Sequence, residues 1–542
     1  MGQALVHVFQ VLLLGVCFAA QWTVTIAAGP IIDLGYAQYQ GSVNTTTNVA
    51  TFLGVRYATP PLGNLRFRAP QPPQNITGVQ QATAFPNGCW QAPPGLSSTN
   101  PLRSRALDIG MSEDCLFLNV YYPSDTAGVP IASLPVIAWI HGGGYISGSA
   151  SIFRGTDIIA QSNRGVVVVA IQYRLGLFGF LPGAEVKNNG ALNAGLLDQD
   201  FALRWVNKHI AKFGGDPSKV TIWGESAGAG SVLQHIVAND GNTQPQLFRA
   251  AITSSTFLPS QYNYNDRIPE LLYSEVVSQT GCSSAADSLT CLREIDPVIM
   301  VLVNVAINVA AFYGTWTMVP VVDGEFITQR PTLALAHGKV NGEGLLSVTN
   351  SFEGTSFVDQ STAATANATQ YALELFPNFE DAQAANVGAL YANVGSPLSQ
   401  NDAIMGESIF ICPTYYLLDA FAGRSYKGEF AIPPALHGQD QAYYFPSLLV
   451  DQPNVVGTLY NNTAFIDAFA QSFTSFAISL DPNIKVDPTT ITPAWNKWEA
   501  GHTEMLFNKT EQDVPVVKPV MTDETLLNRC RFWQSESQQT AQ

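Results

Sequence analysis

The stretch FGGDPSKVTIWGESAG, residues 213–228, decides the fold of this chain. Its Val220 to Trp223 segment is a short apolar run that predicts a strand, and the small residues after the motif fit the start of a helix. Gly224 and Gly228 flank Ser226 and permit a tight turn that a bulky side chain would obstruct. A strand-to-helix turn of this kind lifts the serine hydroxyl clear of the sheet.

The segments around this stretch alternate between strand and helix patterns. Residues 166–171 (VVVVAI) form a continuous apolar run, typical of a strand buried on both faces. Residues 193–208 have helical apolar spacing. Further strand candidates are residues 134–140, 250–253 and 345–349. This alternation predicts a mostly parallel sheet with helices on both faces and long helical insertions above it.

Two further residues complete a candidate catalytic group with Ser226. A serine hydroxyl needs a base to take its proton, and that base needs an acid to fix its tautomer. Glu353 directly follows the strand candidate LLSVT, at the sheet edge where open α/β sheets hold ligands. His437 lies in the loop PALHGQD, where an exposed imidazole belongs. In hydrolases with this serine turn, the acid follows the serine in the sequence and the histidine follows the acid, and Ser226, Glu353 and His437 have that order.

Other residues compete for these roles. His235 falls on the helix expected after Ser226, so it is expected to be a helix-surface or core residue. His337 and His502 lie in loops without a supporting motif. Asp323 in VVDGEF is the rival acid, although Asp-Gly is typical of a turn. Glu225 precedes the serine and is expected to have a small electrostatic role at most, because adjacent residues on a tight turn point different ways.

A glycine-rich loop follows the strand candidate at residues 134–140. Its sequence is HGGGY, residues 141–145, which resembles loops that donate backbone N–H groups to an oxyanion. Glycines let the backbone come close to a tetrahedral intermediate, and the N–H of Ala227 would add another donor. The loop therefore predicts an oxyanion hole upstream of the nucleophile.

Together these motifs resemble the type-B carboxylesterase/lipase family. FGGDPSKVTIWGESAG is similar to its nucleophile signature, and EDCLFLNVYYP, residues 113–123, resembles its second signature. Smaller similarities run from FLGVRYATPP near Phe52 to HGQD at His437, so the resemblance covers most of the chain. The sequence IIDLGYAQYQG, residues 31–41, is similar to the fungal extracellular branch.

The resemblance implies an α/β-hydrolase fold with Ser226, Glu353 and His437 as the catalytic triad. It implies that the oxyanion hole is formed by Gly143, Gly144 and Ala227. It also implies two disulfides, Cys89–Cys115 and Cys282–Cys291, while Cys412 and Cys530 either pair or stay buried and free. No metal-ligand set or nucleotide loop occurs in the sequence, so neither a metal nor another cofactor is expected.

The N-terminus and the composition predict export. Residues 1–28 are typical of a signal peptide, with a membrane anchor as the less favoured interpretation. Residues 29–542 then form a single domain with six cysteines, because no repeat or linker divides them. The five glycosylation sequons are Asn44, Asn75, Asn367, Asn461 and Asn508.

A net charge of −16 without basic clusters argues against a nucleic-acid partner, and no other stretch predicts stable membrane insertion. The oligomeric state is left open.

The substrate class is predicted from departures from family lipases. The segment between Cys89 and Cys115 holds only 25 residues, is rich in Pro and Ser, and carries Arg103 and Arg105. Ser356 occupies a position where related lipases tend to have an aromatic residue. These features favour soluble short- or medium-chain esters, or aryl esters such as hydroxycinnamoyl esters. The alternatives are a lipase or sterol esterase and, less favoured, a non-catalytic adhesion module, which would lack the serine.

Overall fold

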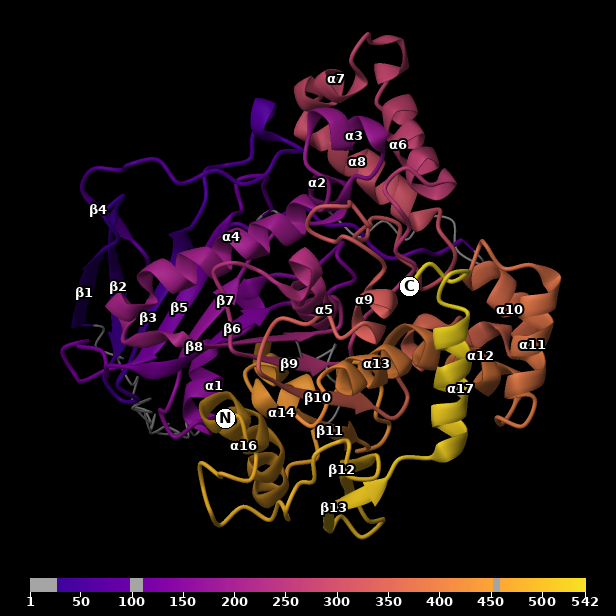
Figure 1. The fold of residues 1–542 in the computed structure, drawn as a ribbon. Coiled ribbons are helices and arrows are strands. Elements are labelled where there is room, and N and C mark those ends of the chain that lie inside the picture. The colour runs from indigo at the N-terminus through magenta and orange to yellow at the C-terminus, as the bar shows by residue number, and fades with distance from the viewer. Residues whose placement is uncertain (1–26, 98–110, 452–458) are drawn as a thin grey trace, which may run out of the picture.

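The computed structural model describes residues 27–97, 111–451 and 459–542, which form one 13-stranded sheet covered by helices (Figure 1). The central strands are β6 (Leu134–Ile140), β7 (Val167–Ile171), β8 (Gly215–Glu225), β9 (Ala250–Ser254), β10 (Gly344–Asn350), β11 (Ser425–Phe430) and β12 (Thr503–Lys509). They lie side by side in the order β7-β6-β8-β9-β10-β11-β12, and each neighbouring pair is parallel. The predicted mostly parallel sheet is therefore confirmed.

Antiparallel strands extend both edges of this parallel centre. They are β1 (Ala27–Asp33), β2 (Gln38–Asn44), β3 (Val49–Arg56) and β5 (Phe117–Pro123) at one edge, and β13 (Pro515–Met521) at the other. The short β4 (Val79–Gln81) pairs with β2. The predicted signal peptide lies outside the described residues except for Ala27 and Ala28, which begin β1.

Helices cover both faces of the sheet, and β6 shows why its sequence is apolar throughout. Successive side chains of a strand point to opposite faces. Val136, Ala138 and Ile140 join one hydrophobic core with α4 (Ala194–His209) and α5 (Ala227–Gly241). Ile137 and Trp139 join a second core with α1 (Gly155–Gln161) and α16 (Thr463–Ser479). Both faces are thus buried, as the continuous apolar runs predict.

Two groups of helices are inserted where strands leave the sheet. Between β9 and β10 the chain forms α6 (Arg267–Gln279), α7 (Ser288–Glu294) and α8 (Pro297–Val309). Between β10 and β11 it forms α10 (Ala368–Leu375), α11 (Asp381–Tyr391) and α12 (Pro397–Gly406). Figure 1 shows these two groups as separate lobes beyond the sheet. The remaining helices are α2 (Gly176–Phe180), α3 (Ala184–Asn189), α9 (Pro331–Ala336), α13 (Cys412–Ala420), α14 (Gln441–Tyr444), α15 (Leu448–Asp451) and α17 (Glu524–Ser535).

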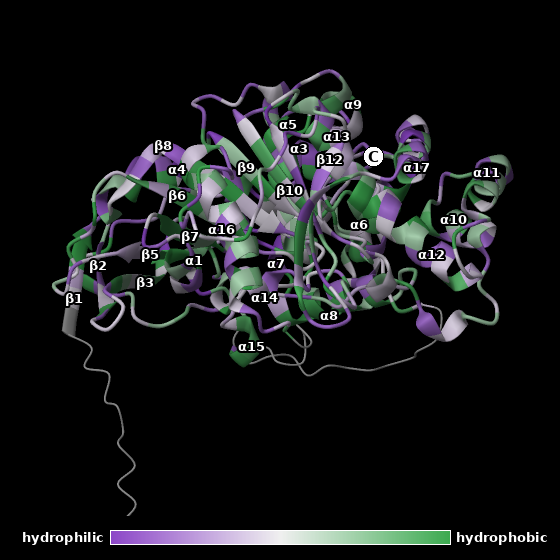
Figure 2. Cartoon of the chain, turned by 90° about the horizontal axis from the view of Figure 1, so that it is seen from below, coloured by the Kyte–Doolittle hydropathy of each residue, from purple (hydrophilic) through white to green (hydrophobic). Residues whose placement is uncertain are grey.

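Helix α8 is the most apolar of the inserted helices, with Asn304 and Asn308 as its polar residues. Its start is set by Asp296, whose side chain accepts the N–H of Val298, with Pro297 in the first turn. Figure 2 shows α8 at the periphery with mostly hydrophobic colouring, and Val298 and Leu302 are exposed. Among the described residues, no helix has the length and apolarity needed to cross a membrane.

The described residues contain three disulfides. Cys89–Cys115 and Cys282–Cys291 agree with the pairing implied by the family resemblance. The third bond, Cys412–Cys530, answers the question that the sequence leaves open and joins the start of α13 to α17. It links positions 118 residues apart, and on the chain-entropy model loops of that size stabilise by about 4–5 kcal/mol.

Candidate active site

Ser226 lies between the end of β8 and the start of α5, as the motif predicts. Its backbone has φ 55° and ψ −125°, a conformation that is strained for a residue with a side chain. The turn is held by hydrogen bonds from Ser226 N to the Ser254 carbonyl, 2.9 Å, and from Gly230 N to the Ser226 carbonyl, 2.8 Å. A Cβ on Gly224 would lie 2.3 Å from the Gly228 carbonyl carbon, so the turn requires glycine there.

Glu353 and His437 form the strongest polar contact of the site. His437 Nδ1 lies 2.6 Å from Glu353 Oε2, and both side chains are buried or nearly so. The other carboxylate oxygen of Glu353 accepts hydrogen bonds from Asn350 N, 2.6 Å, and Ser255 Oγ, 2.7 Å. Glu353 is thus fixed by β10 and by the loop after β9. With Nδ1 donating to this carboxylate, Nε2 of a neutral His437 is a proton acceptor.

The second nitrogen of His437, Nε2, faces the carboxyl group of Glu225. Nε2 is buried and has no hydrogen-bond partner within the described residues. Burial by itself lowers the pKa of His437, but the charge and hydrogen bond of Glu353, followed by the charges of Glu225 and Asp440, raise it above its usual value. The imidazole is therefore oriented on one side and open for proton transfer on the other.

Glu225 differs from its expected position. Its Oε1 lies 3.4 Å from His437 Nε2, so the side chain faces the imidazole rather than pointing away from it, and the expected small electrostatic role stays a prediction. Burial raises the pKa of Glu225 to about 8; the charge of His437 opposes this, and Asp440 and Glu353 add to it. A Cβ on Gly142 would lie 2.6 Å from Glu225 Oε2 and 3.0 Å from Ser226 Cβ. We call Glu225, Ser226, Glu353 and His437 the polar floor.

The glycine-rich loop lies directly beside the polar floor. Gly143 and Gly144 have φ values of 107° and 63°, which favour glycine. The carbonyl of Gly143 accepts Ile146 N and Ser147 N, and no hydrogen bond within the described part of the chain uses the N–H of Gly143 or Gly144. Ala227 is the first residue of α5, so its N–H has no acceptor within the helix. The three predicted N–H groups are thus available as donors.

Four aromatic rings from separate segments border the polar floor, and we call them the aromatic wall: Phe257, Trp316, Phe357 and Phe410. Trp316 lies 4.7 Å from Phe257 and 5.0 Å from Phe357 between ring centroids. Phe357 and Phe410 lie 4.9 Å and 4.5 Å from the ring of His437. Sequence reasoning missed Phe257, Trp316 and Phe410, because none belongs to a motif. Phe257 and Phe410 are buried and Trp316 and Phe357 half-buried, whereas the neighbouring Ser356 is exposed.

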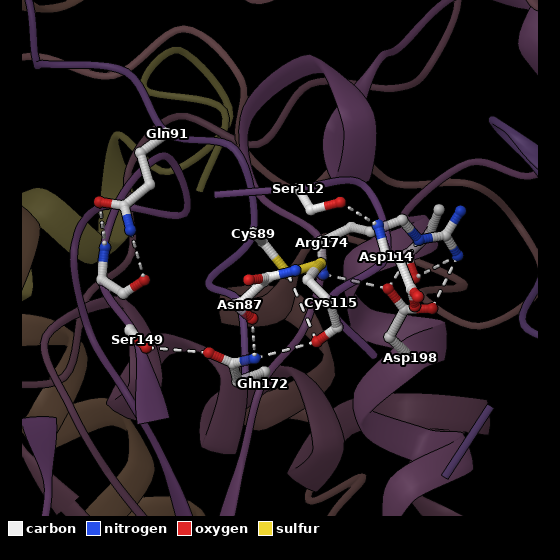
Figure 3. The surroundings of a disulfide bond; sticks show 12 residues. Asn87, Cys89, Gln91, Ser112, Asp114, Cys115, Ser149, Gln172, Arg174 and Asp198 are labelled. Atoms are coloured by element: carbon white, nitrogen blue, oxygen red, sulfur yellow. Dashed lines mark hydrogen bonds and ion pairs between the residues drawn. A yellow bond between two sulfur atoms is a disulfide. The ribbon is translucent and has the colours of Figure 1, made fainter. Parts of the chain in front are cut away.

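The Cys89–Cys115 disulfide closes a loop that is hydrogen-bonded close to the glycine-rich segment (Figure 3). Gln91 Nε2 donates to the Gly148 carbonyl at 3.0 Å, and Gly148 N donates to Gln91 Oε1 at 3.1 Å. Gln172 Nε2 donates to the Cys115 carbonyl at 3.0 Å and to the Asn87 carbonyl. The start of this loop is therefore anchored near the glycine-rich segment. Residues 98–110, which include Arg103 and Arg105, lie outside the described ranges.

The structure separates the rival residues from the site. Asp323 Oδ1 accepts the N–H groups of Glu325 and Ile327, and its Oδ2 accepts Asn193 Nδ2 at 2.6 Å, so it organises a turn as expected. His235 is buried on α5 and bonded to Gln199. His337 and His502 are exposed. Of the sequons, Asn44, Asn75, Asn367 and Asn461 are exposed, whereas Asn508 is half-buried in β12.

Comparison with known proteins gives the family of the chain. Residues 28–533 match the model of the Carboxylesterase family. The chain belongs to this family. This carboxylesterase is 33% identical over 506 residues to Lipase 4 of Diutina rugosa, which covers 85% of this chain and 88% of that protein. It is 30% identical over 548 residues to the secreted triacylglycerol lipase LIP1 of Gibberella zeae, covering 91% and 88%.

A solved structure agrees with the fold of this carboxylesterase. The crystal structure of Aspergillus niger EstA matches with a TM-score of 0.82 and 31% sequence identity, covering 95% of this chain and 99% of that one. The predicted family and the α/β-hydrolase fold are therefore confirmed. The chain is a carboxylic ester hydrolase. Among the described residues, no group of three or more His, Cys, Asp or Glu side chains could hold a metal ion.

Proposed function

We propose that this enzyme hydrolyses esters through an acyl-enzyme on Ser226, with His437 as the base and Glu353 as its orienting acid. The observation that carries this proposal is the 2.6 Å contact between His437 Nδ1 and Glu353 Oε2. Nε2 makes no hydrogen bond within the described residues and lies 3.4 Å from Oε1 of Glu225, the residue before Ser226. The contact fixes the tautomer in which Nε2 accepts a proton. The strained backbone of Ser226 supports the same role.

The proposed reaction has two halves that use the same residues. Ser226 Oγ attacks the ester carbonyl carbon while its proton passes to His437 Nε2, and the carbonyl oxygen becomes an oxyanion. The N–H groups of Gly143, Gly144 and Ala227 stabilise that oxygen. The intermediate then collapses, and the departing alkoxide or phenoxide takes the proton from Nε2. Water next gives a proton to Nε2 and attacks the acyl carbon, so that Ser226 leaves with that proton and the carboxylic acid is released.

For the substrate, we propose soluble short- or medium-chain esters or aryl esters. The aromatic wall supports this choice, because bulky rings close the space beside His437 and offer faces on which an aryl acyl group can stack. The test is the rate of tributyrin hydrolysis across its solubility limit. We expect ordinary saturation with no jump at the limit, together with high kcat/KM on p-nitrophenyl acetate, butyrate or methyl ferulate.

The alternative is a lipase, which is favoured by the names of the two fungal relatives. A lipase lid exposes apolar surface when it opens in water, so lipid at an interface promotes opening. A several-fold increase in rate above the solubility limit, with long-chain emulsions preferred, would favour this alternative and contradict the proposed substrate class.

We also propose that residues 1–28 direct secretion and that residues 29–542 act as a single mature domain. Three disulfides support an oxidising destination, and one relative is itself described as secreted. The exposed sequons at Asn44, Asn75, Asn367 and Asn461 support glycosylation more than the half-buried Asn508 does. N-terminal sequencing of enzyme from culture medium, with mass analysis before and after glycan removal, tests both points. A mature chain that retains residues 1–28 would contradict the proposed cleavage.

A further inference from the structure

An apolar cavity adjoins the aromatic wall. It has a volume of about 220 Å³, and Trp316 of the wall is among its lining residues. Its other walls come from both helical insertions, with mostly apolar side chains; these include Leu272, Phe312, Leu375, Met405 and Ile409. The volume and lining are those of a site for an apolar group rather than for a charged one.

Trp316 belongs both to the lining of this cavity and to the aromatic wall beside His437. A Cβ built on Gly144 would lie 2.0 Å from Trp316 Nε1, so the indole packs directly against the proposed oxyanion loop. Its other neighbours are rings of the aromatic wall, with Phe357 5.0 Å away between centroids. One side chain therefore contacts the active-site loop and also lines the cavity.

The contacts of Trp316 also show which interactions fix the position of its indole. Within the described residues its Nε1 donates no hydrogen bond, so the indole is retained by packing alone. Truncating an indole that is held by packing removes only packing contacts. Truncating one that donates a hydrogen bond would also leave its buried acceptor without a partner. A smaller side chain at this position would thus extend the cavity toward Gly144 and the aromatic wall without leaving a buried polar group unpaired.

We propose that Trp316 sets the acyl-length limit of the enzyme by closing off a chamber that would otherwise extend the acyl site. The chamber would take the distal methylenes of a medium- or long-chain acyl group. This inference rests on the proposed acyl-enzyme at Ser226. Each methylene that moves from water into an apolar site favours binding by about fourfold, so opening the chamber should favour long acyl chains strongly.

The experiment compares wild type with Trp316→Ala on p-nitrophenyl esters from acetate to laurate. The measured quantity is the ratio of kcat/KM on decanoate to kcat/KM on butyrate. We expect this ratio to rise by at least about tenfold in Trp316→Ala, because several methylenes become buried. Trp316→Phe is the matched control, since it keeps an aromatic ring at this position, and its ratio should stay near that of wild type.

A second substitution that fills the cavity again tests whether the cavity causes the change in the decanoate-to-butyrate ratio. Leu272 lies on the helical side of the cavity, so Leu272→Trp added to Trp316→Ala should return the ratio toward the wild-type value. A folded Trp316→Ala enzyme with an unchanged ratio would overturn the proposal. If alanine prevents folding, Trp316→Leu is judged by the same criterion.

A second readout separates this proposal from the proposed substrate class. Phosphonylation rates with short- and long-chain p-nitrophenyl alkylphosphonates report chain acceptance without turnover. A wild type that already prefers long chains contradicts the proposed substrate class, whereas the Trp316 proposal is decided only by the change between variant and wild type. Equal changes in phosphonylation rate for short and long chains would overturn the Trp316 proposal.

Discussion

The polar floor and the aromatic wall of the site are built by different kinds of contact. Floor residues sit at the ends of β8 and β10 and after β11, and Glu353 is fixed by hydrogen bonds of 2.6 and 2.7 Å. Wall residues come from separate loops and helices and meet through ring packing. Directional bonds allow few substitutions, whereas packing tolerates changes of shape. From this difference we infer that residues at the strand ends determine the catalytic chemistry, and that aromatic residues of the inserted loops and helices determine which acyl groups fit.

The comparison predicts the largest effect for the nucleophile. Ser226→Ala should lower kcat by about 10⁶-fold while leaving the fold intact, because the hydroxyl that forms the acyl-enzyme is gone. Steady-state kinetics with p-nitrophenyl butyrate measures the loss, and the melting temperature serves as the folding control. Retention of more than a small residual activity in a pure preparation would mean that the floor is not where the chemistry occurs.

The next effect concerns the acid of the polar floor. Glu353→Gln should lower kcat on the order of 10⁴-fold, because His437 loses the charge that orients it. The matched control is Asp323→Asn, which removes a buried carboxylate that organises a turn. It should leave kcat nearly unchanged and reduce stability by about 1–3 kcal/mol. The opposite pattern of the two variants would identify Asp323 as the acid and contradict the floor as described.

The smallest expected effect is a shift in the pH dependence of kcat/KM, which tests the role of Glu225. Ionised Glu225 contributes to the raised pKa of His437, but burial raises the pKa of Glu225 itself to about 8, so Glu225 is mostly protonated below that pH. Glu225→Gln should therefore lower the pKa of His437 only slightly. His437 must be neutral to act as a base, and the acidic limb of kcat/KM should therefore move to lower pH, by less than about half a pH unit. The exposed Glu343→Gln is the control. A shift to higher pH would contradict the assigned contact.

Much of the polar floor could be predicted from the sequence because each member lies in a recognisable local pattern. The glycines around Ser226, the strand before Glu353 and the loop around His437 are all short-range features. The side-chain direction of Glu225 could not be predicted, since it depends on how β8 meets the His437 loop. The sequence supplied its proximity to Ser226 but not its contact with the imidazole.

The aromatic wall and the third disulfide depend on long-range packing. Trp316 is one aromatic residue among many, and only the position of its loop against Gly144 reveals its place in the site. Cys412 and Cys530 are 118 positions apart, so spacing could not decide whether they pair. Strands β6 to β10 could be predicted because their residues are mostly apolar, whereas β11 (SYKGEF) and β12 (TEMLFNK) mix polar and apolar residues and were not predicted. The antiparallel β2 alternates buried residues with exposed or half-buried ones, which is a weaker pattern.

Covalent trapping tests the central claim, that Ser226 is the nucleophile of this ester hydrolase, most directly. The enzyme is incubated with a p-nitrophenyl alkylphosphonate, and intact mass analysis is followed by peptide mapping of the adduct. We predict one phosphonyl group per chain, on Ser226, and no adduct in Ser226→Ala under the same conditions. An adduct mapped to another serine, or equal labelling of the Ser226→Ala variant, would contradict the account.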